Sequence, residues 1–304
     1  MAKTHEFLIN DDLQHWARKP DFGSLKASSN SVQARVENWV IPRDLWGTDL
    51  EGKKVAIQIA ADPDRPGARI FEDYTERHRE YIGPYSAMPL SNEERMMHQG
   101  AALDAVRQYG PQKHDTFGFY LNSWENNLRL SRATRNQDPA NSHLARAGMS
   151  YRQPLHAYKF EEGKIAKNNN NEALKKEYTG IFVAPPDFRF YKARDGWTQE
   201  IHDNFMKNVL VNVRQTIAHA REQGVDKLLL TPIGCDTQLN NPYLVAAAFR
   251  IALEEDQKMY ANDPLECIFA IGPALRNVIP NQPQWLSKDR LSPALREIFN
   301  EVLK

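Results

Sequence analysis

One stretch limits the possible folds more than any other: residues 227–253, which read KLLLTPIGCDTQLNNPYLVAAAFRIAL. It opens with the apolar run Leu228–Leu230, which ends in a turn at Pro232-Ile233-Gly234. A polar loop then leads to Asn241-Pro242, where Asn is a good N-cap and Pro is favoured as the first helical residue. The segment therefore predicts a strand, a glycine turn and a helix, in that order.

This order is typical of an anion site, because free backbone N–H groups and the helix dipole point at one spot. On this segment alone, an ordinary strand-to-helix connection in an α/β protein is the favoured interpretation. The segment alone leaves both interpretations open, so the rest of the chain has to decide between them.

Further strands and helices follow from apolar runs and from helical spacing. The apolar run KVAIQIA (54–60) is continuous enough to predict a strand that is covered on both faces. The expected strands are 34–41, 54–60, 180–185, 228–230 and 267–271. The expected helices are 91–109, 198–223, 241 to about 255, and one that Ser292-Pro293 caps.

Strands and helices alternate over the C-terminal half, which predicts an α/β protein with parallel crossovers. In such a sheet, ligands bind at the carboxyl ends of the strands. We therefore expect the loops DPDRPGAR, PPDFRFYK, IGCDTQLNN and GPALRN to gather at one edge.

The composition excludes several classes of partner. Lys+Arg and Asp+Glu are both 39 in 304 residues, so no broad binding to nucleic acid or to an anionic membrane is expected. No apolar run approaches the roughly 20 residues of a membrane helix, and the N-terminus has no signal-like stretch. Two cysteines without ligand spacing fit a reducing compartment, so a cytoplasmic location is expected. The nine histidines show no HxH or HExxH spacing, and neither a metal nor a cofactor is expected.

Five blocks in a fixed order carry a family resemblance: IAADPDRPGAR, SNEERMM, VAPPDF, IGCDTQLNNP and CIFAIGP. They resemble the macrodomain fold, and within it the poly(ADP-ribose) glycohydrolase-like branch of bacterial type, in a divergent form. The resemblance implies a three-layer α/β fold with a mixed, largely parallel central sheet. It also implies an N-terminal helical extension (1–33) and a macrodomain-like domain (34–304) with an insertion at about 111–178.

For function, the resemblance implies recognition and hydrolysis of an ADP-ribose linkage on a modified protein or small molecule. Cleavage passes through an oxocarbenium-like state, which needs a carboxylic acid for the leaving group and a carboxylate at the ribose or water. By the resemblance, Glu94 is the acid/base and Glu93 its ribose-binding neighbour. The alternative for Glu94 is the partner of Ser91 in an S-x-x-E capping box.

Asp64 is a further candidate catalytic carboxylate, with Asp62 beside it in the loop after the first central strand. Their alternative role is turn formation around Pro63. An ADP-ribose site also needs an aromatic ring to stack on adenine and an arginine to contact phosphate, and the loop after the 228–230 strand is expected to contact the diphosphate. The expected ligand-binding residues are Asp62, Gly67, Arg69, Phe188, Gly234, Cys235, Asp236, Thr237, Asn240 and Asn241.

The chain departs from the family pattern in three places. The glycine triplet is reduced to Gly67-Ala68-Arg69, Asn92 replaces a Gln, and Asp236 replaces the second glycine of the diphosphate loop. A carboxylate beside a diphosphate repels it unless a cation or a hydrogen bond intervenes. Three alternatives to a hydrolase therefore stay open: a non-catalytic ADP-ribose binder, an α/β protein for another nucleotide, and an interaction protein whose 111–178 insertion docks a partner. The oligomeric state and a role as a secreted effector in a host cytoplasm also stay open.

Overall fold

The structure is a computed structural model that describes residues 32–39, 41, 43–60, 128–130, 146–151, 154–161, 164–185, 198–235, 240–272 and 288–304. The strands are β1 (Ala34–Glu37), β2 (Val55–Ala60), β3 (Leu128–Leu130), β4 (Arg146–Tyr151), β5 (Leu155–Tyr158), β6 (Phe160–Glu161), β7 (Lys164–Ile165), β8 (Lys175–Ala184), β9 (Lys227–Leu230) and β10 (Glu266–Ala270). The helices are η1 (Arg43–Trp46), η2 (Thr48–Leu50), α6 (Gln199–Glu222), α7 (Pro242–Met259) and α8 (Lys288–Leu303). None of the described helices is both long and apolar enough to span a bilayer.

The main sheet has the strand order β1-β10-β9-β2-β8-β4-β3, with β5 paired to the first part of β8. Strands β1, β10, β9, β2 and β8 run parallel to one another, whereas β3, β4 and β5 are antiparallel to their neighbours. The predicted class is confirmed: the protein is α/β with a mixed, largely parallel central sheet.

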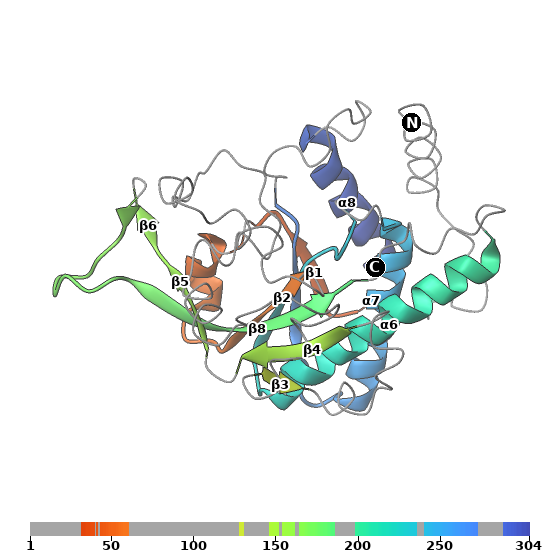
Figure 1. Cartoon of the computed structure of the whole chain (residues 1–304), viewed down its shortest axis with the longest axis horizontal. Helices are drawn as coiled ribbons and strands as arrows, with labels where there is room; N and C mark the ends of the chain where they lie inside the picture. Colours follow the sequence, from red (N-terminus) through yellow and green to blue (C-terminus); the bar gives the residue numbers. More distant parts are fainter. Residues whose placement is uncertain are drawn as a thin grey trace, which may run out of the picture.

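Helices α6, α7 and α8 cover one face of this sheet (Figure 1). Ala56 of β2, Leu228 of β9 and Phe269 of β10 lie in the buried cluster beneath them. Successive residues of a strand point to opposite faces. Ile57 and Leu229, which alternate with these residues, are buried as well. The sheet is therefore covered on both sides, as the run KVAIQIA predicts.

The predicted helices of the C-terminal half are confirmed, with one correction at α8. Helix α6 agrees with the predicted range 198–223, and Gly224 follows it with a φ of 61°. Helix α8 begins at Lys288, so the prediction that Ser292-Pro293 caps it is wrong. Pro293 removes one backbone hydrogen bond near the helix start. Burial of Leu295 and Phe299 on this helix outweighs that loss.

Residues 111–178 contain antiparallel strands that were not predicted from the sequence. Strands β3 and β4 extend the main sheet beyond β8, and β5–β7 form an arm beside the first half of β8 (Figure 1). At the end of this arm the Asn168–Asn171 run is an exposed turn, as expected. Asn168 Oδ1 accepts hydrogen bonds from two backbone N–H groups, and Asn171 has a φ of 64°. The predicted extension 1–33 lies almost wholly outside the described residues, and the predicted helix 91–109 lies outside them entirely.

Candidate functional site

The parallel strands end at a common edge, where four loops begin. These ends are Ala60 of β2, Ala184 of β8, Leu230 of β9 and Ala270 of β10. The four loops singled out in the sequence follow these residues. Their starting points therefore lie at one edge of the sheet, as predicted. Among these loops, the structure describes most fully the one that follows β9.

The loop after β9 is closed on itself by backbone hydrogen bonds. Cys235 N–H donates to Pro232 O at 3.1 Å, and Asn240 N–H donates to Gly234 O at 2.9 Å. Gly234 has a φ of 70°, a region that side chains disfavour. The sequence therefore needs a glycine at this position to bring the chain around from β9 to α7.

Two predicted ligand-binding side chains instead hold the loop together. Asn240 Nδ2 donates to Ile233 O at 3.4 Å, and Cys235 Sγ lies 3.8 Å from the same oxygen. Both Asn240 and Cys235 are fully buried. Any contact of this described part of the loop with a ligand is therefore made by backbone rather than by these two side chains.

Asn241 is the N-cap of α7, as predicted, and its side chain occupies the start of the helix. Asn241 Oδ1 accepts from the N–H groups of Tyr243 and Leu244, at 3.0 and 3.3 Å. The N–H of Val245 donates to Asn241 O, and Pro242 has none. The N–H groups of the first turn are therefore not free to meet an anion, because the cap and the helix already satisfy them. The helix dipole still favours negative charge at this end.

The structure thus brings together Gly234, Cys235, Asn240 and Asn241 beside the ends of β2 and β10. The other predicted site residues lie outside the described residues: Asp62, Asp64, Gly67, Arg69, Glu93, Glu94, Phe188, Asp236 and Thr237. Within the described parts of the chain, no group of three His, Cys, Asp or Glu side chains has the arrangement of a metal site.

Sequence reasoning missed a buried Ser–His–Glu arrangement between β4 and α6. Ser150 Oγ lies 2.8 Å from His219 Nε2, and Glu222 Oε2 lies 3.6 Å from His219 Nδ1. A nucleophile must reach its substrate, but Ser150 and His219 are both fully buried. The arrangement therefore ties α6 to β4. No sequence pattern indicates it, because Ser150 and His219 lie 69 residues apart.

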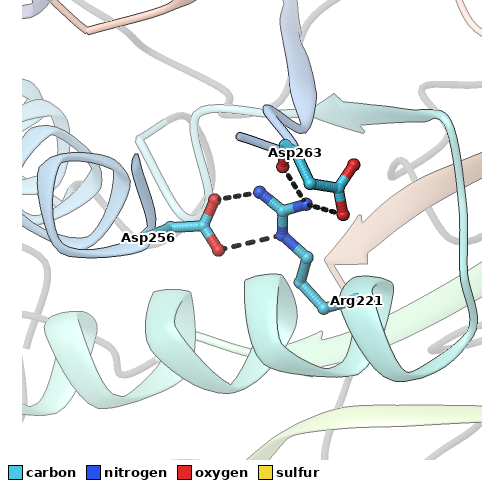
Figure 2. Close-up of polar contacts among 3 residues, drawn as sticks. All are labelled: Arg221, Asp256 and Asp263. Atoms are coloured by element: carbon cyan, nitrogen blue, oxygen red, sulfur yellow. Dashed lines mark hydrogen bonds and ion pairs between the residues drawn. The ribbon is translucent and has the colours of Figure 1, made fainter. Parts of the chain in front are cut away.

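A concavity of about 620 Å³ lies between the C-terminal ends of α6 and α7, away from the loop edge. Its wall holds Arg221, which donates to both carboxylate oxygens of Asp256 at 2.7 and 3.0 Å and to Asp263 (Figure 2). The Arg221 guanidinium also lies 4.5 Å from the ring centre of Tyr260. Burial alone would lower the pKa of Arg221, but the hydrogen bond and charge of Asp256, with Asp263, raise it.

Arg214 on the same wall forms a second two-point pair, with Glu255 at 2.6 and 2.7 Å. Both guanidinium groups of this concavity are therefore neutralised within the protein, and neither is available to an anionic ligand. The concavity is a joint between two helices, whereas the loop edge is the candidate site.

No protein-family model matches the chain, and no curated protein matches it. Solved structures do match it. The poly(ADP-ribose) glycohydrolase of Deinococcus radiodurans, in complex with ADP-ribose, is 14% identical, with 99% of this chain and 93% of that chain covered and a TM-score of 0.50. The enzyme of the same name from Thermomonospora curvata is 15% identical, with 97% and 82% covered and a TM-score of 0.45. The chain therefore has the macrodomain-like fold of a bacterial poly(ADP-ribose) glycohydrolase.

Proposed function

We propose that the protein binds ADP-ribose at the carboxyl edge of the sheet and hydrolyses the linkage between ADP-ribose and a protein or small molecule. The observation that carries this proposal is the closed loop between β9 and α7. Gly234 with its positive φ turns the chain beside the ends of β2 and β10, and the dipole of an 18-residue helix points at the loop. The fold shared with a glycohydrolase that binds ADP-ribose supports the same ligand.

The chemistry is assigned to carboxylates at the start of the predicted helix 91–109 and in the loop after β2. Glu94 is the general acid that protonates the leaving group, Glu93 holds the ribose hydroxyls, and Asp64 is the additional carboxylate. Because the N-cap satisfies the first turn of α7, the diphosphate is assigned, as the family resemblance implies, to other backbone amides of the segment IGCDTQLNN.

The first experiment is titration calorimetry of the whole chain with ADP-ribose, AMP and NAD. Saturable binding of ADP-ribose, tighter than that of AMP, is the expected result. No binding of ADP-ribose would overturn the proposal and would direct attention to another nucleotide or to a protein partner.

A matched pair of glycine variants tests whether the β9–α7 loop is the binding site. Gly234→Ala and Gly224→Ala each place a Cβ at a positive φ, 70° and 61° respectively. Each is expected to cost about 1 kcal/mol of stability. Only Gly234→Ala is expected to weaken ADP-ribose binding, because Gly224 follows α6 at the opposite end of the sheet. Equal affinities of the two variants would remove the loop from the site.

Turnover is tested with Glu94→Gln and Asp64→Asn on ADP-ribosylated protein. Loss of hydrolysis with ADP-ribose binding retained is expected for the hydrolase. A non-catalytic binder is the second candidate, which the sequence favours through Asp236 and the reduced Gly67-Ala68-Arg69. Binding by the unmodified chain without any turnover would establish that second candidate.

A further inference from the structure

Strands β2 and β9 separate at the candidate site. Their ladder ends at the pair Ile57–Leu229. Beyond it, β2 continues to Ala60 against β8, and Leu230 of β9 pairs with Phe269 of β10. The next described strand after β2 in the chain is β3, which lies on the β8 side of β2, whereas the next after β9 is β10, which lies on the opposite side. In open α/β sheets, ligands bind at the point where the strand order reverses.

Gln58 spans the place where the ladder is missing. Its Oε1 accepts the N–H of Thr231 at 3.2 Å, and its Nε2 donates to Thr216 Oγ1 of α6 at 3.4 Å. Thr216 Oγ1 in turn donates to Asn212 O at 2.9 Å. A neutral amide can accept from one group and donate to another, so Gln58 joins the end of β9 to α6.

The same turn of α6 also fixes β8. Asn212 Nδ2 donates to the carbonyl of Ala184, the last residue of β8, at 3.1 Å. Two loops of the candidate edge start directly after these anchored residues, one after Ala184 and one at Thr231. One helical turn therefore sets the positions from which both loops leave the sheet.

These side chains are expensive to bury. Gln58, Asn212 and Thr216 all have a relative exposure of 0%. A buried polar group destabilises a protein unless hydrogen bonds compensate it, and apolar side chains of similar size would fill this layer at lower cost. The polar bonds thus supply a geometric constraint that apolar packing does not.

We propose that Gln58, Thr216 and Asn212 are positioning residues for the ligand: they act through the loops that begin at Pro185 and Thr231, without touching the ligand. The inference rests on the proposed function, because it concerns the same edge of the sheet. The affinity for ADP-ribose then depends on residues beneath the loops as well as on residues within the loops.

The closing experiment measures ADP-ribose affinity in Thr216→Val and Gln58→Met. Loss of one hydrogen bond of the relay is expected to weaken binding about three- to tenfold. Thr216→Ser keeps the hydroxyl and is expected to bind as the unmodified chain does. Gln215→Met is the matched control, because Gln215 is a buried α6 residue next to Thr216 whose Oε1 has no partner among the described residues. It is expected to leave the affinity unchanged.

Unchanged affinity in Thr216→Val and Gln58→Met, in a chain that binds ADP-ribose, would overturn this inference and leave the proposed function intact. A second measurement, on the ligand-free chain, tests this inference independently of the proposed function. Hydrogen exchange of the amides in 231–241 is expected to be about three- to tenfold faster in both variants, whereas that of β10 stays the same. Unchanged exchange in 231–241 would overturn the inference whether or not ADP-ribose binds.

Discussion

Helices α6 and α7 lie side by side on the same face of the sheet, yet they are held there by different chemistry (Figure 1). Nine of the eleven buried residues of α7 are apolar, and among them Phe249 lies edge-on to Phe269 at 4.9 Å. The buried side of α6 combines an apolar stripe with a polar one. The polar stripe consists of Asn212, Gln215, Thr216 and His219.

The difference teaches what each helix contributes. Apolar packing is non-directional, so α7 supplies most of its stabilisation through burial alone. Hydrogen bonds are directional, so the polar side chains of α6 fix the positions of the particular strand residues that they contact. Its polar stripe reaches β8 through Asn212, β2 through Thr216 and β4 through His219.

The largest expected effect is on the apolar side. Phe249→Ala should lower the free energy of unfolding by about 3–5 kcal/mol, because it removes a fully buried ring from contact with Phe269 and Phe299. Urea denaturation measures this effect, and Phe249→Leu serves as the milder control. A loss below about 1 kcal/mol would mean that α7 is not held by burial.

The pair Arg221–Asp256 joins the two helices, and the next expected effect concerns it. Asp256→Ala should cost about 2–4 kcal/mol, since it leaves a guanidinium with 12% side-chain exposure without its main counter-charge. Glu255→Ala breaks a pair of similar geometry whose side chains are 47% and 45% exposed, and should cost less than about 1 kcal/mol. Equal losses in the two variants would contradict the role given to burial.

Ser150→Ala tests the polar stripe of α6. The variant leaves the buried ring of His219 without its hydroxyl partner and should cost about 1–3 kcal/mol. Hydrolysis of ADP-ribosylated protein, once measurable, should be unchanged at a temperature where the variant is folded. Loss of turnover in a folded Ser150→Ala variant would show that the Ser–His–Glu arrangement is catalytic after all.

The last expected effect is a pH dependence that compares the two faces of the sheet. Burial raises the pKa of Cys267 on the helical face and the pKa of Tyr178, and the charge of Asp256 adds to the shift of Cys267. The folded state keeps these protons after the unfolded state has lost them, so stability falls as the pH rises above the ordinary values of 9.0 and 10.0.

Urea denaturation between pH 8 and pH 11 checks this expectation. The variant Cys267→Ala should lose the part of the decline that begins near pH 9, and Tyr178→Phe the part that begins near pH 10. If stability declines equally in both variants and in the unmodified chain, the decline is caused by other titratable groups.

Much of the parallel half of the fold could be predicted from the sequence, since each of its elements has a local signal. The run KVAIQIA indicates β2, the four-residue spacing of apolar side chains indicates α6, and Asn241-Pro242 indicates the start of α7. The strand β4 has no such signal, because RAGMSY lacks both a long apolar run and strict alternation. Its position depends on β8, which it meets through an irregular register.

The site was less predictable than the fold, for a physical reason. The roles of Gly234 and Asn241 depend on local structure: Gly234 adopts a positive φ in a turn, and Asn241 caps a helix. Both roles can be recognised in the sequence. Gln58 reads there only as one polar residue within an apolar strand. Its meaning depends on Thr231, which lies 173 residues later, and no local pattern carries that information.

The central place of β2 has a consequence for the order of events during synthesis. Its neighbours β8 and β9, like the β10 partner of β1, all come from the second half of the chain. At about 5–20 residues per second, Thr231 emerges roughly ten to thirty-five seconds after Gln58. Until β8 is made, roughly six to twenty-five seconds after Gln58 at the same rate, the strand VAIQIA, apolar on both faces, has no neighbour to pair with. The growing chain is therefore most exposed to aggregation, and most dependent on chaperones, before β8 and β9 exist.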